Sequence, residues 1–357
     1  MTRLDVLGAE LTTQGHDALL VTSRSNIRYL SGFSGTSGYL LVRSDASAVL
    51  VTDARYAERA GDELRDDSDL VVEVAKRPLF AALTTLLSEA ASIALESEHL
   101  SWSEAREITE QLGAKRCVPV DGLVEAQRAQ KDSEELAHIR AACSVTDAAF
   151  EAVVSNMRPG RTESEVAWAF AEAVQRCGGD DVAYDPIVAS GPNASRPHHG
   201  TGARELQVGD LVIVDAGAMV AGYRSDMTRS FVLGSPTSQQ REMLDAVQVA
   251  QAEGVAAVEP GLAASDIDQA CRSSLESAGL AEWFTHGTGH GLGLDIHEAP
   301  WVLATATATL APGHVITVEP GVYLPGVGGV RWEDTVLVTA TGSETLTHTP
   351  KQPVIDL

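Results

Sequence analysis

Two acidic side chains, Asp215 and Glu319, each end an apolar strand-like row. Side-chain alternation along the predicted strand 211–214 puts Asp215 on its apolar face. Glu319 closes the predicted strand 315–318 in the same way. A single carboxylate at a strand end is ordinarily a surface group. Two carboxylates that each end an apolar strand favour a shared polar site at the edge of the hydrophobic core.

Two further acidic residues, Asp226 and Glu333, complete the set. A turn at Val220–Gly222 would bring Asp226, eleven residues after Asp215, beside it. Glu333 interrupts the predicted strand 330–338. Four carboxylates buried together would repel one another and partly protonate. Two divalent cations would remove that penalty, so the pattern favours a metal site.

Glycine alternates with other residues around His290 in the segment 285–298. His286 and His290 have the spacing of a zinc-protease helix, but the glycines after His286 do not fit a helix. A dinucleotide-binding loop also matches poorly, because no capped helix follows. Alternate glycines permit close backbone approach, so His290 could be a neutral nitrogen ligand. His286 and His297 are either hydrogen-bonded supporting groups or catalytic groups.

One imidazole with four carboxylates is a donor set rich in hard oxygen. Such a set favours Mn²⁺, with Co²⁺ and Zn²⁺ as alternatives, and differs from a thiolate or all-imidazole metal site. Two metal ions about 3.5–4 Å apart can share a hydroxide and polarise a carbonyl group. The sequence therefore predicts hydrolysis by a hydroxide bridging two divalent metal ions, without a serine or cysteine nucleophile.

The elements that must position these residues fall into two domains. For the N-terminal domain, strands are predicted at residues 18–22, 39–42, 48–52 and 70–74, and helices at residues 56–64, 78–87 and 102–112. A polar, turn-rich stretch follows, and a capped long helix begins at Ser133. We therefore predict an α/β domain of residues 1–124 and a second domain of residues 125–357.

The second domain repeats itself at an offset of 101 residues. Pro159–Gly160 recurs as Pro260–Gly261, and Gly178 recurs as Gly279. Each copy predicts a helix, a Pro-Gly turn and a capped second helix that ends at glycine, followed by strands. The predicted class is α+β, with two similar halves about a pseudo-twofold axis and a cleft between their sheets.

The composition excludes several kinds of partner. Acidic residues number 50 and basic residues 26, and a net charge of −24 repels nucleic acid and anionic membranes. The four cysteines form no CxxC pair, which is typical of a reducing cytosol. No signal peptide or bilayer-spanning run is visible, so we expect a cytoplasmic protein.

Together these features resemble the pita-bread dinuclear metallopeptidases, which include methionine aminopeptidase, aminopeptidase P and prolidase. The resemblance is carried by the segments Val212–Gly217, His286–Gly293, Val318–Gly321 and Val330–Asp334. The segments Asn26–Gly35 and Thr52–Tyr56 are similar to the creatinase-type N-terminal domain of the proline-specific branch. The resemblance implies a pita-bread catalytic domain preceded by a smaller creatinase-like α/β domain.

The family pattern implies a role for each matching ligand. Asp226 and Glu333 would bridge the two metal ions. Asp215 would chelate one ion, and His290 with Glu319 would bind the other. Glu319 would also handle the proton of the attacking water.

Other matching side chains surround the family's substrate: His198, His286, His297, Arg331, Tyr184 and Tyr323. His198 and His297 would act in catalysis with Glu319. The substrate would be bound by His198 together with His286, Arg331, Tyr184 and Tyr323. Arg331 would hold a carboxylate, either a metal ligand or the substrate's C-terminus, with an ordinary ion pair as the competing interpretation. The two tyrosines have the competing interpretation of packing residues.

The resemblance implies an Xaa-Pro dipeptidase that acts as a homodimer on small peptides with proline at the second position. Xaa-Pro aminopeptidase, acting on longer peptides, remains open because Trp301 occupies a position where some prolidases have arginine. A non-catalytic peptide-binding protein of the same fold and a metal-free, creatinase-like amidine hydrolase are the alternatives from other classes. The filled ligand positions argue against both.

Overall fold

The computed structural model describes residues 1–64 and 69–357, which form two compact units, Met1–Arg128 and Ala129–Leu357. The boundary predicted after residue 124 falls inside helix α6 (Leu123–Ala129), close to the division between the units. Each unit has its own apolar core and is described separately. Among the described residues, no helix has both the length and the apolar character needed to cross a bilayer.

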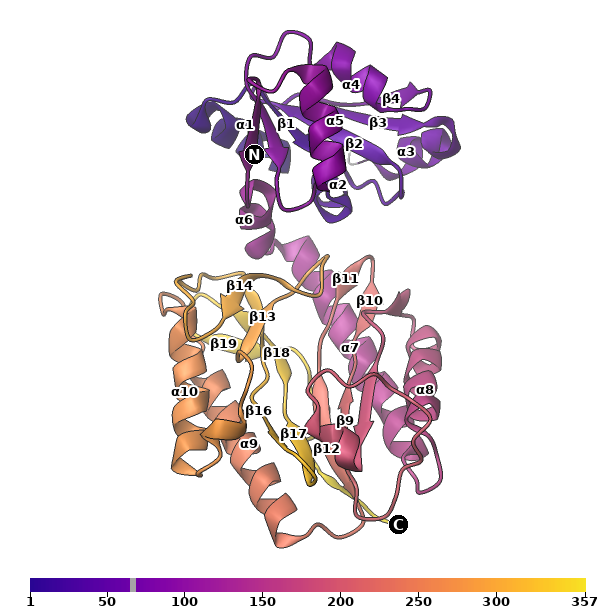
Figure 1. Ribbon diagram of the computed structural model, residues 1–357, viewed down its shortest axis with the longest axis vertical. Coiled ribbons are helices and arrows are strands. Elements are labelled where there is room, and N and C mark those ends of the chain that lie inside the picture. The colour runs from indigo at the N-terminus through magenta and orange to yellow at the C-terminus, as the bar shows by residue number, and fades with distance from the viewer. Residues whose placement is uncertain (65–68) are drawn as a thin grey trace. The chain divides into compact units, whose positions relative to one another are not determined.

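The N-terminal unit is built on one mixed sheet (Figure 1). Its strands are β1 (Ala18–Val21), β2 (Gly38–Arg43), β3 (Ala48–Asp53), β4 (Leu70–Ala75), β5 (Ile93–Glu96) and β6 (Cys117–Val120). They pair in the order β4-β3-β2-β1-β5-β6, and β2 is antiparallel to both of its neighbours while the other pairs are parallel. The predicted strands are confirmed within one residue at each end.

The helices of this unit are α1 (Arg3–Gln14), α2 (Arg24–Ser31), α3 (Ala57–Glu63), α4 (Phe80–Leu86), α5 (Trp102–Leu112) and α6. Helix α5 coincides with its prediction because Ser101 and Glu104 form a capping box, in which each side chain accepts the other's backbone amide. The predicted helix 56–64 begins one residue late, after a short 3₁₀ turn at Ala54–Tyr56.

In the C-terminal unit, helices lie on both sides of a central group of strands (Figure 1). They are α7 (Ser133–Asn156), α8 (Glu163–Arg176), α9 (Ser238–Ala256) and α10 (Ala264–Ser277). The predicted repeat is confirmed in position, since α10 begins and ends 101 residues after α8. The predicted cap is present only in the first copy, because Thr162 caps α8 whereas the corresponding Ala263 has no side-chain acceptor for α10. Gly160 and Gly261 precede these helices with φ of 87° and 90°. Both copies therefore need glycine, which adopts this left-handed conformation without strain.

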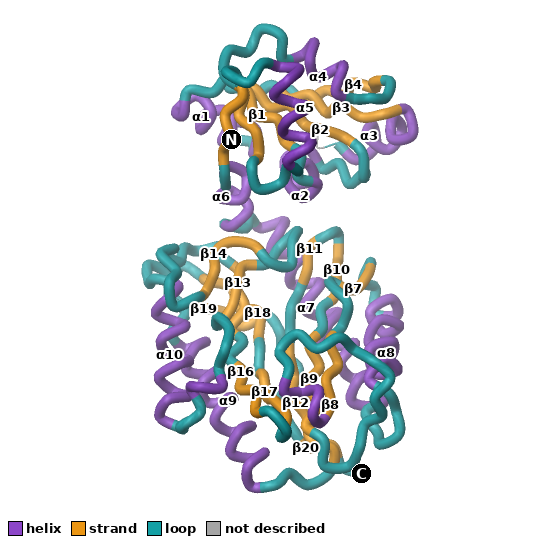
Figure 2. Tube along the Cα trace, viewed as in Figure 1, coloured by secondary structure: helices purple, strands orange, loops and turns teal. Residues whose placement is uncertain are grey.

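The strands of the C-terminal unit form two main sheets and two small ones (Figure 2). The first half contributes β7 (Asp181–Val182), β8 (Ile187–Ser190), β9 (Leu211–Asp215), β10 (Ala218–Val220), β11 (Tyr223–Arg224) and β12 (Thr228–Leu233). The second contributes β13 (Gly289–Gly291), β14 (Glu298–Val302), β15 (Val315–Val318), β16 (Gly321–Leu324), β17 (Gly328–Arg331), β18 (Asp334–Val338), β19 (Ser343–Thr345) and β20 (Val354–Ile355). The main sheets run β20-β12-β9-β8 and β14-β13-β15-β18-β19.

Each half of this unit has its own core. Phe150 of α7 and Phe170 of α8 pack with Val212 and Val214 of β9. In the second half, the cluster of α9, α10, β15 and β18 includes the fully buried Trp332. Because each sheet is covered by the helix pair of its own half, the α+β class with a pseudo-twofold repeat is confirmed.

The segment Val330–Val338 is not the single strand that its pattern predicts. It forms β17 and β18, which pair with different strands, β16 and β15. Trp332 lies in the break, and its buried indole N–H donates to the Leu244 carbonyl group. A buried indole needs both apolar contacts and an acceptor, and meeting both draws the chain out of the ladder. The prediction of one continuous strand was therefore wrong, but Arg331 and Glu333 still face the same way, since both side chains contact Thr228 Oγ1.

Candidate metal centre

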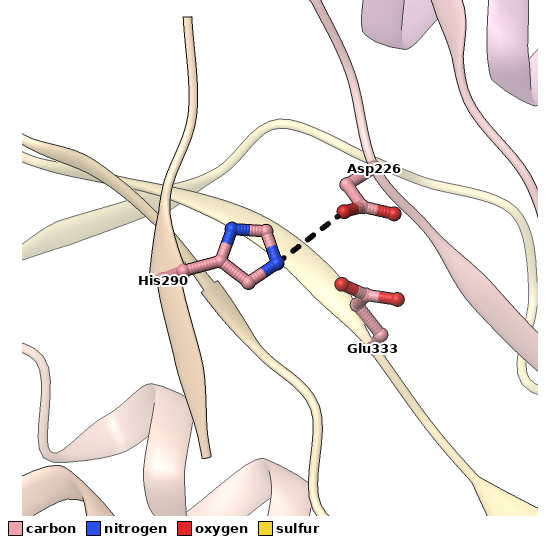
Figure 3. Close-up of side chains that lie close together, drawn as sticks. All are labelled: Asp226, His290 and Glu333. Carbon is pink, nitrogen blue, oxygen red and sulfur yellow. Dashed lines mark ion pairs between the residues drawn. The ribbon is translucent and has the colours of Figure 1, made fainter. Parts of the chain in front are cut away.

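Asp226, His290 and Glu333 meet at one point of the C-terminal unit (Figure 3). Each offers a ligand atom, and these atoms lie within 4.8 Å of one another among buried residues. His290 Nε2 lies 3.6 Å from Asp226 Oδ2 and 3.4 Å from Glu319 Oε1. Four of the predicted ligands thus form a compact group centred on one imidazole.

Asp215, the fifth predicted ligand, is linked to Asp226 by a hydrogen bond from Tyr184 to both carboxylates. The predicted turn is confirmed, since Ala221 and Gly222 join β10 to β11 with φ of 50° and 80°. The Tyr184 hydroxyl donates a hydrogen bond shared by the carboxylates of Asp215 and Asp226. Antiparallel pairing of β9 with β12 places Asp215 opposite Thr228. The structure therefore brings together all five predicted ligands.

His290 lies on β13, where neighbouring backbones approach very closely. A Cβ atom on Gly289 would lie 2.0 Å from the Thr317 carbonyl oxygen, and one on Gly291 would lie 2.2 Å from the Ala299 carbonyl oxygen. Any larger residue would overlap these atoms, so only glycine lets β13 fit between β14 and β15. The predicted use of the alternate glycines is confirmed.

The hydrogen bonds of His290 prepare its Nε2 atom as a ligand. Nδ1 lies 3.0 Å from the Gly291 carbonyl oxygen, which can only accept, so Nδ1 carries the ring proton. Burial lowers the pKa of His290 and thereby favours the neutral ring. Nε2 then presents a lone pair to the carboxylates of Asp226 and Glu319, as a metal ligand must.

Burial makes the charged form of the acidic cluster costly. It raises the pKa of Asp226 and of Glu333 well above the usual range, and repulsion from Asp215 and Asp226, respectively, raises them further. Burial also raises the pKa of Glu319 to about 7, although the Arg331 guanidinium opposes the shift. Bound cations would offset this repulsion directly.

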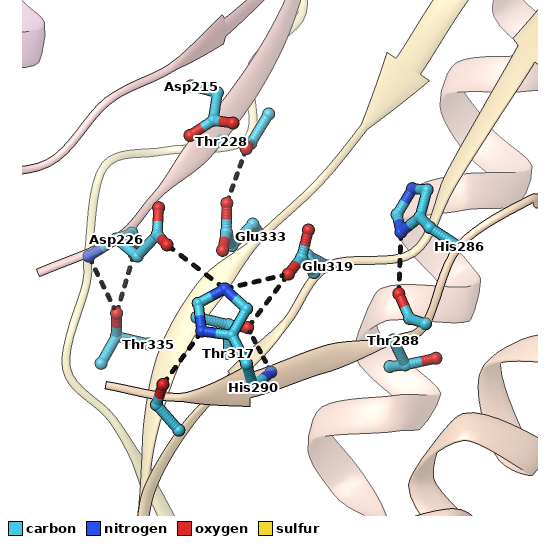
Figure 4. A network of polar contacts seen from close by, with 12 residues as sticks. Asp215, Asp226, Thr228, His286, Thr288, His290, Thr317, Glu319, Glu333 and Thr335 are labelled. Atoms are coloured by element: carbon cyan, nitrogen blue, oxygen red, sulfur yellow. Dashed lines mark hydrogen bonds and ion pairs between the residues drawn. The ribbon is translucent and has the colours of Figure 1, made fainter. Parts of the chain in front are cut away.

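Two threonines hold the carboxylates in place, a role that the sequence reasoning missed. Thr228 Oγ1 donates to Glu333 Oε2 at 2.6 Å (Figure 4). Thr317 Oγ1 donates to Glu319 Oε1 at 3.2 Å and accepts the backbone amide of His290. Each threonine lies two residues from a predicted ligand, so this spacing was the available signal.

Arg331 is a buried cation bound to Asp215. Its Nη2 donates to Asp215 Oδ2 at 2.5 Å, and its Nε donates to Thr228 Oγ1 at 3.0 Å. Its Nη1 donates to the Tyr323 hydroxyl at 2.7 Å. The carboxylate that Arg331 holds in this structure is thus that of a predicted metal ligand.

Tyr323 and His286 continue the hydrogen-bond network. His286 Nδ1 lies 2.7 Å from the Gly287 carbonyl oxygen and therefore carries the proton. Burial lowers the pKa of His286 to about 3, so its neutral Nε2 accepts the Tyr323 hydroxyl at 2.9 Å. Both ring nitrogens of His286 are engaged, an arrangement that favours the supporting interpretation of this histidine.

A cavity of about 330 Å³ lies beside the acidic cluster. All the predicted site residues line it except Tyr323, which is 5% exposed. Its apolar lining residues include Ile187, Pro197, Ile296, Trp301 and Leu303. The ring centroid of His297 lies 4.3 Å from that of His290, and its plane is within 21° of that of Trp301. The cavity thus combines a cluster of polar groups with apolar lining residues, as ligand-binding pockets in proteins usually do.

The residues at the cavity floor fit divalent metal ions. Their donors are carboxylate oxygens and one imidazole nitrogen with its lone pair available, the set that first-row divalent cations prefer. Buried carboxylates repel one another, and the protein groups around them do not fully neutralise their charge. Bound cations would supply the missing positive charge.

Fold and site together define a class of metal-dependent peptidases with a pseudo-symmetric catalytic domain. Residues 137–340 match metallopeptidase family M24, and the chain belongs to this family. Residues 3–130 match the creatinase/prolidase N-terminal domain. The resemblance is confirmed, and the protein is a hydrolase that depends on divalent metal ions.

Relatives named as Xaa-Pro peptidases are similar over nearly the whole chain. The Xaa-Pro dipeptidase of Pyrococcus horikoshii is 34% identical over 339 residues, which cover 94% of both chains. The solved structure of an Xaa-Pro dipeptidase from Bacillus anthracis has a TM-score of 0.94 at 33% identity, covering 99% of both chains. That of an X-Pro aminopeptidase from Thermotoga maritima has a TM-score of 0.87 at 31% identity, covering 96% of this chain and 98% of the other.

Proposed function

We propose that this protein hydrolyses the peptide bond before proline in Xaa-Pro dipeptides. The activities named for the dipeptidase relatives support this, because the similarity extends over both domains. The observation that carries the proposal is the convergence of Asp226, His290 and Glu333 on one point beside a peptide-sized cavity.

We infer that the centre holds two metal ions, with Mn²⁺ as the native metal and Co²⁺ or Zn²⁺ as alternatives. Asp226 and Glu333 would bridge the ions, Asp215 would chelate one, and His290 with Glu319 would bind the other. When bound, the ions would polarise the scissile carbonyl group and acidify the attacking water. Oxygen-rich ligation supports Mn²⁺.

Glu319 would carry the proton in this reaction. Thr317 fixes one carboxylate oxygen of Glu319, and the side chain lines the cavity. Its carboxylate would accept a proton from the attacking water and deliver it to the proline nitrogen as the peptide bond breaks.

His198 and His297 would bind the substrate from the cavity surface. Both side chains are exposed and line the cavity. Although His297 is partly exposed, loss of water around its ring beside the cavity lowers its pKa, and a neutral imidazole keeps one N–H to donate to the oxygen of the scissile carbonyl group as charge develops. Tyr184 and Arg331 would act by orienting Asp215, and Tyr323 with His286 by supporting Arg331.

Xaa-Pro aminopeptidase activity on longer peptides is the second candidate, and one observation favours it. A dipeptidase must bind the free carboxylate of the terminal proline. In the described part of the cavity wall, Arg331 is engaged by Asp215, and Trp301 contributes an indole instead of a charge. A carboxylate-binding cation would then have to come from elsewhere.

We also propose a cytoplasmic homodimer with small peptides as its partners. Cys117, Cys143, Cys177 and Cys271 form no disulfide in the described residues, as expected in a reducing compartment. The acidic net charge disfavours nucleic acid and anionic membranes. The homodimer follows from the family resemblance.

A substrate-length series tests the proposal. Protein stripped with a chelator and reloaded with Mn²⁺, Co²⁺ or Zn²⁺ would be incubated with Ala-Pro and with Ala-Pro-Ala, and metal content would be measured on the same sample. We expect metal-dependent cleavage of Ala-Pro at the higher rate. Equal or faster cleavage of Ala-Pro-Ala would establish the aminopeptidase instead. Turnover that survives Asp226→Asn or complete metal removal would rule out the proposed centre.

A further inference from the structure

Lys131 forms a buried ion pair with Glu298, the residue that follows His297. Lys131 Nζ lies 2.8 Å from Glu298 Oε1, and the two side chains are 0% and 7% exposed. An ammonium group withdrawn from water is costly unless a carboxylate lies close to it. The position of Glu298 is therefore tied to that of Lys131.

Lys131 is anchored in turn to the segment that leads to Glu319. Its backbone amide donates to the Gly313 carbonyl group at 2.9 Å. Gln130 forms an antiparallel bridge with His314, the residue before β15. Strand β15 ends next to Glu319, and β14 begins at Glu298, next to His297. Lys131 therefore connects the strand that precedes Glu319 with the strand that follows His297.

The ion pair packs against the loop between His290 and His297. A Cβ atom on Gly293 would lie 2.1 Å from Glu298 Oε1 and 3.2 Å from Lys131 Cε. Gly291 pairs with Glu298 in the β13–β14 ladder. The backbone of this loop is thus confined between the ladder and the ion pair.

His297 depends on that backbone for its position. Among the described residues, its imidazole makes ring contacts with His290 and Trp301 and no hydrogen bond. A ring without a hydrogen bond lies where its backbone and its packing direct it. Glu298 is the adjacent residue, so a shift of Glu298 would move His297 relative to His290.

We propose that the Lys131–Glu298 ion pair is a positioning element that holds His297 over the metal centre. Neither residue lines the cavity, so both would act through His297. The inference rests on the proposed function, because its kinetic readout is Xaa-Pro hydrolysis.

Removal of both charges separates positioning from stability. K131M alone leaves the buried Glu298 carboxylate unpaired, and E298Q alone leaves the buried Lys131 ammonium unpaired. Each single variant should therefore have a lower Tm. K131M/E298Q leaves neither charge, and its Tm should recover toward that of the wild type. We expect this double variant to keep its metal content while its kcat for Ala-Pro falls about tenfold and KM changes less than about twofold.

A His297 background and a matched ion pair provide the controls. In H297A, the added K131M/E298Q change should cause no further loss of kcat, because the pair would act through the missing ring. R140M/E344Q removes an ion pair whose side chains are 43% and 47% exposed, and it should leave kcat unchanged. Crystals of K131M/E298Q should show the His290–His297 centroid separation increased from 4.3 Å.

Wild-type kcat in K131M/E298Q, or an unchanged ring separation, would overturn the inference while leaving the proposed function intact. If K131M/E298Q lowered kcat by the same factor in H297A as in the wild type, the inference would also be overturned, since the ion pair would then act without His297. Absence of Xaa-Pro hydrolysis by the wild type would instead refute the proposed function. The ring separation would still decide whether the ion pair positions His297.

Discussion

Arg331 Nη2 lies 2.5 Å from Asp215 Oδ2, and the arginine side chain is almost completely buried. The same guanidinium group also binds Thr228 and Tyr323. Three different nitrogens of the planar guanidinium reach these partners, whereas the donors of a lysine ammonium all leave from one atom, so a lysine could not replace it. Arg331 therefore fixes the orientation of Asp215 from outside the predicted ligand set.

Replacement of this arginine should impair the centre without removing a ligand. Arg331→Lys keeps the charge but cannot reproduce the three contacts. We expect kcat/KM for Ala-Pro to fall about 10- to 100-fold, with weaker metal retention measured by elemental analysis. Arg140→Lys, at an exposed ion pair, is the matched control. Full activity and metal content in Arg331→Lys would contradict the orienting role.

Removal of the only predicted nitrogen ligand should lower both metal content and activity. His290→Ala deletes the Nε2 atom that faces Asp226 and Glu319. We expect bound metal to decrease and kcat to fall at least about 100-fold. His348→Ala, at an exposed histidine, should behave as the wild type. A His290→Ala protein with an unchanged metal-to-protein ratio would remove His290 from the ligand set.

The stability of the chelated protein should depend on pH through Glu319. Its pKa is about 7 in the folded protein and about 4.5 in the unfolded chain, so the folded state binds more protons between these values. This contribution to stability is complete below about pH 4.5 and is lost as the pH rises through about 7.

Glu319→Gln lacks this titration and provides the comparison. The free energy of unfolding of the variant relative to the wild type should rise by up to about 3 kcal/mol between about pH 4.5 and about pH 8. Denaturant unfolding in chelator at several pH values measures the difference. A difference that is flat or falls with pH would contradict the raised pKa.

Thr228 should be needed for activity through its hydroxyl group. Thr228→Val keeps the shape of the side chain but removes the donor to Glu333 and the acceptor for Arg331 Nε. We expect a loss of about 1–3 kcal/mol in unfolding free energy and a lower kcat. Thr228→Ser restores the hydroxyl and should recover most of the kcat. Equal kcat in the valine and serine variants would show that the hydroxyl is dispensable.

The glycines of β13 should be intolerant of even one added methyl group. In Gly289→Ala the new Cβ would lie 2.0 Å from the Thr317 carbonyl oxygen, so β13 or β15 must move. We expect a destabilisation of at least about 1–3 kcal/mol, measured by denaturant unfolding. Gly342→Ala, whose Cβ would meet no atom within 4 Å, is the control and should change stability little.

The sequence alone determined the identity of the polar residues and the elements that carry them. Asp215 and Glu319 end apolar rows, and strand alternation depends only on local backbone geometry. Capping boxes and Pro-Gly turns are also local signals, so the helix pairs and their repeat could be read directly. The alternate glycines around His290 predicted close backbone approach for the same reason.

Only the tertiary structure decided how these groups meet and what holds them. The break at Trp332 depends on an acceptor at Leu244, far away in the sequence, and strand patterns contain no such information. The contacts of Arg331 with Asp215 and of Lys131 with Glu298 likewise join distant segments. Burial raises the pKa of Glu319 for the same reason, because desolvation follows from the whole fold rather than from neighbours along the chain.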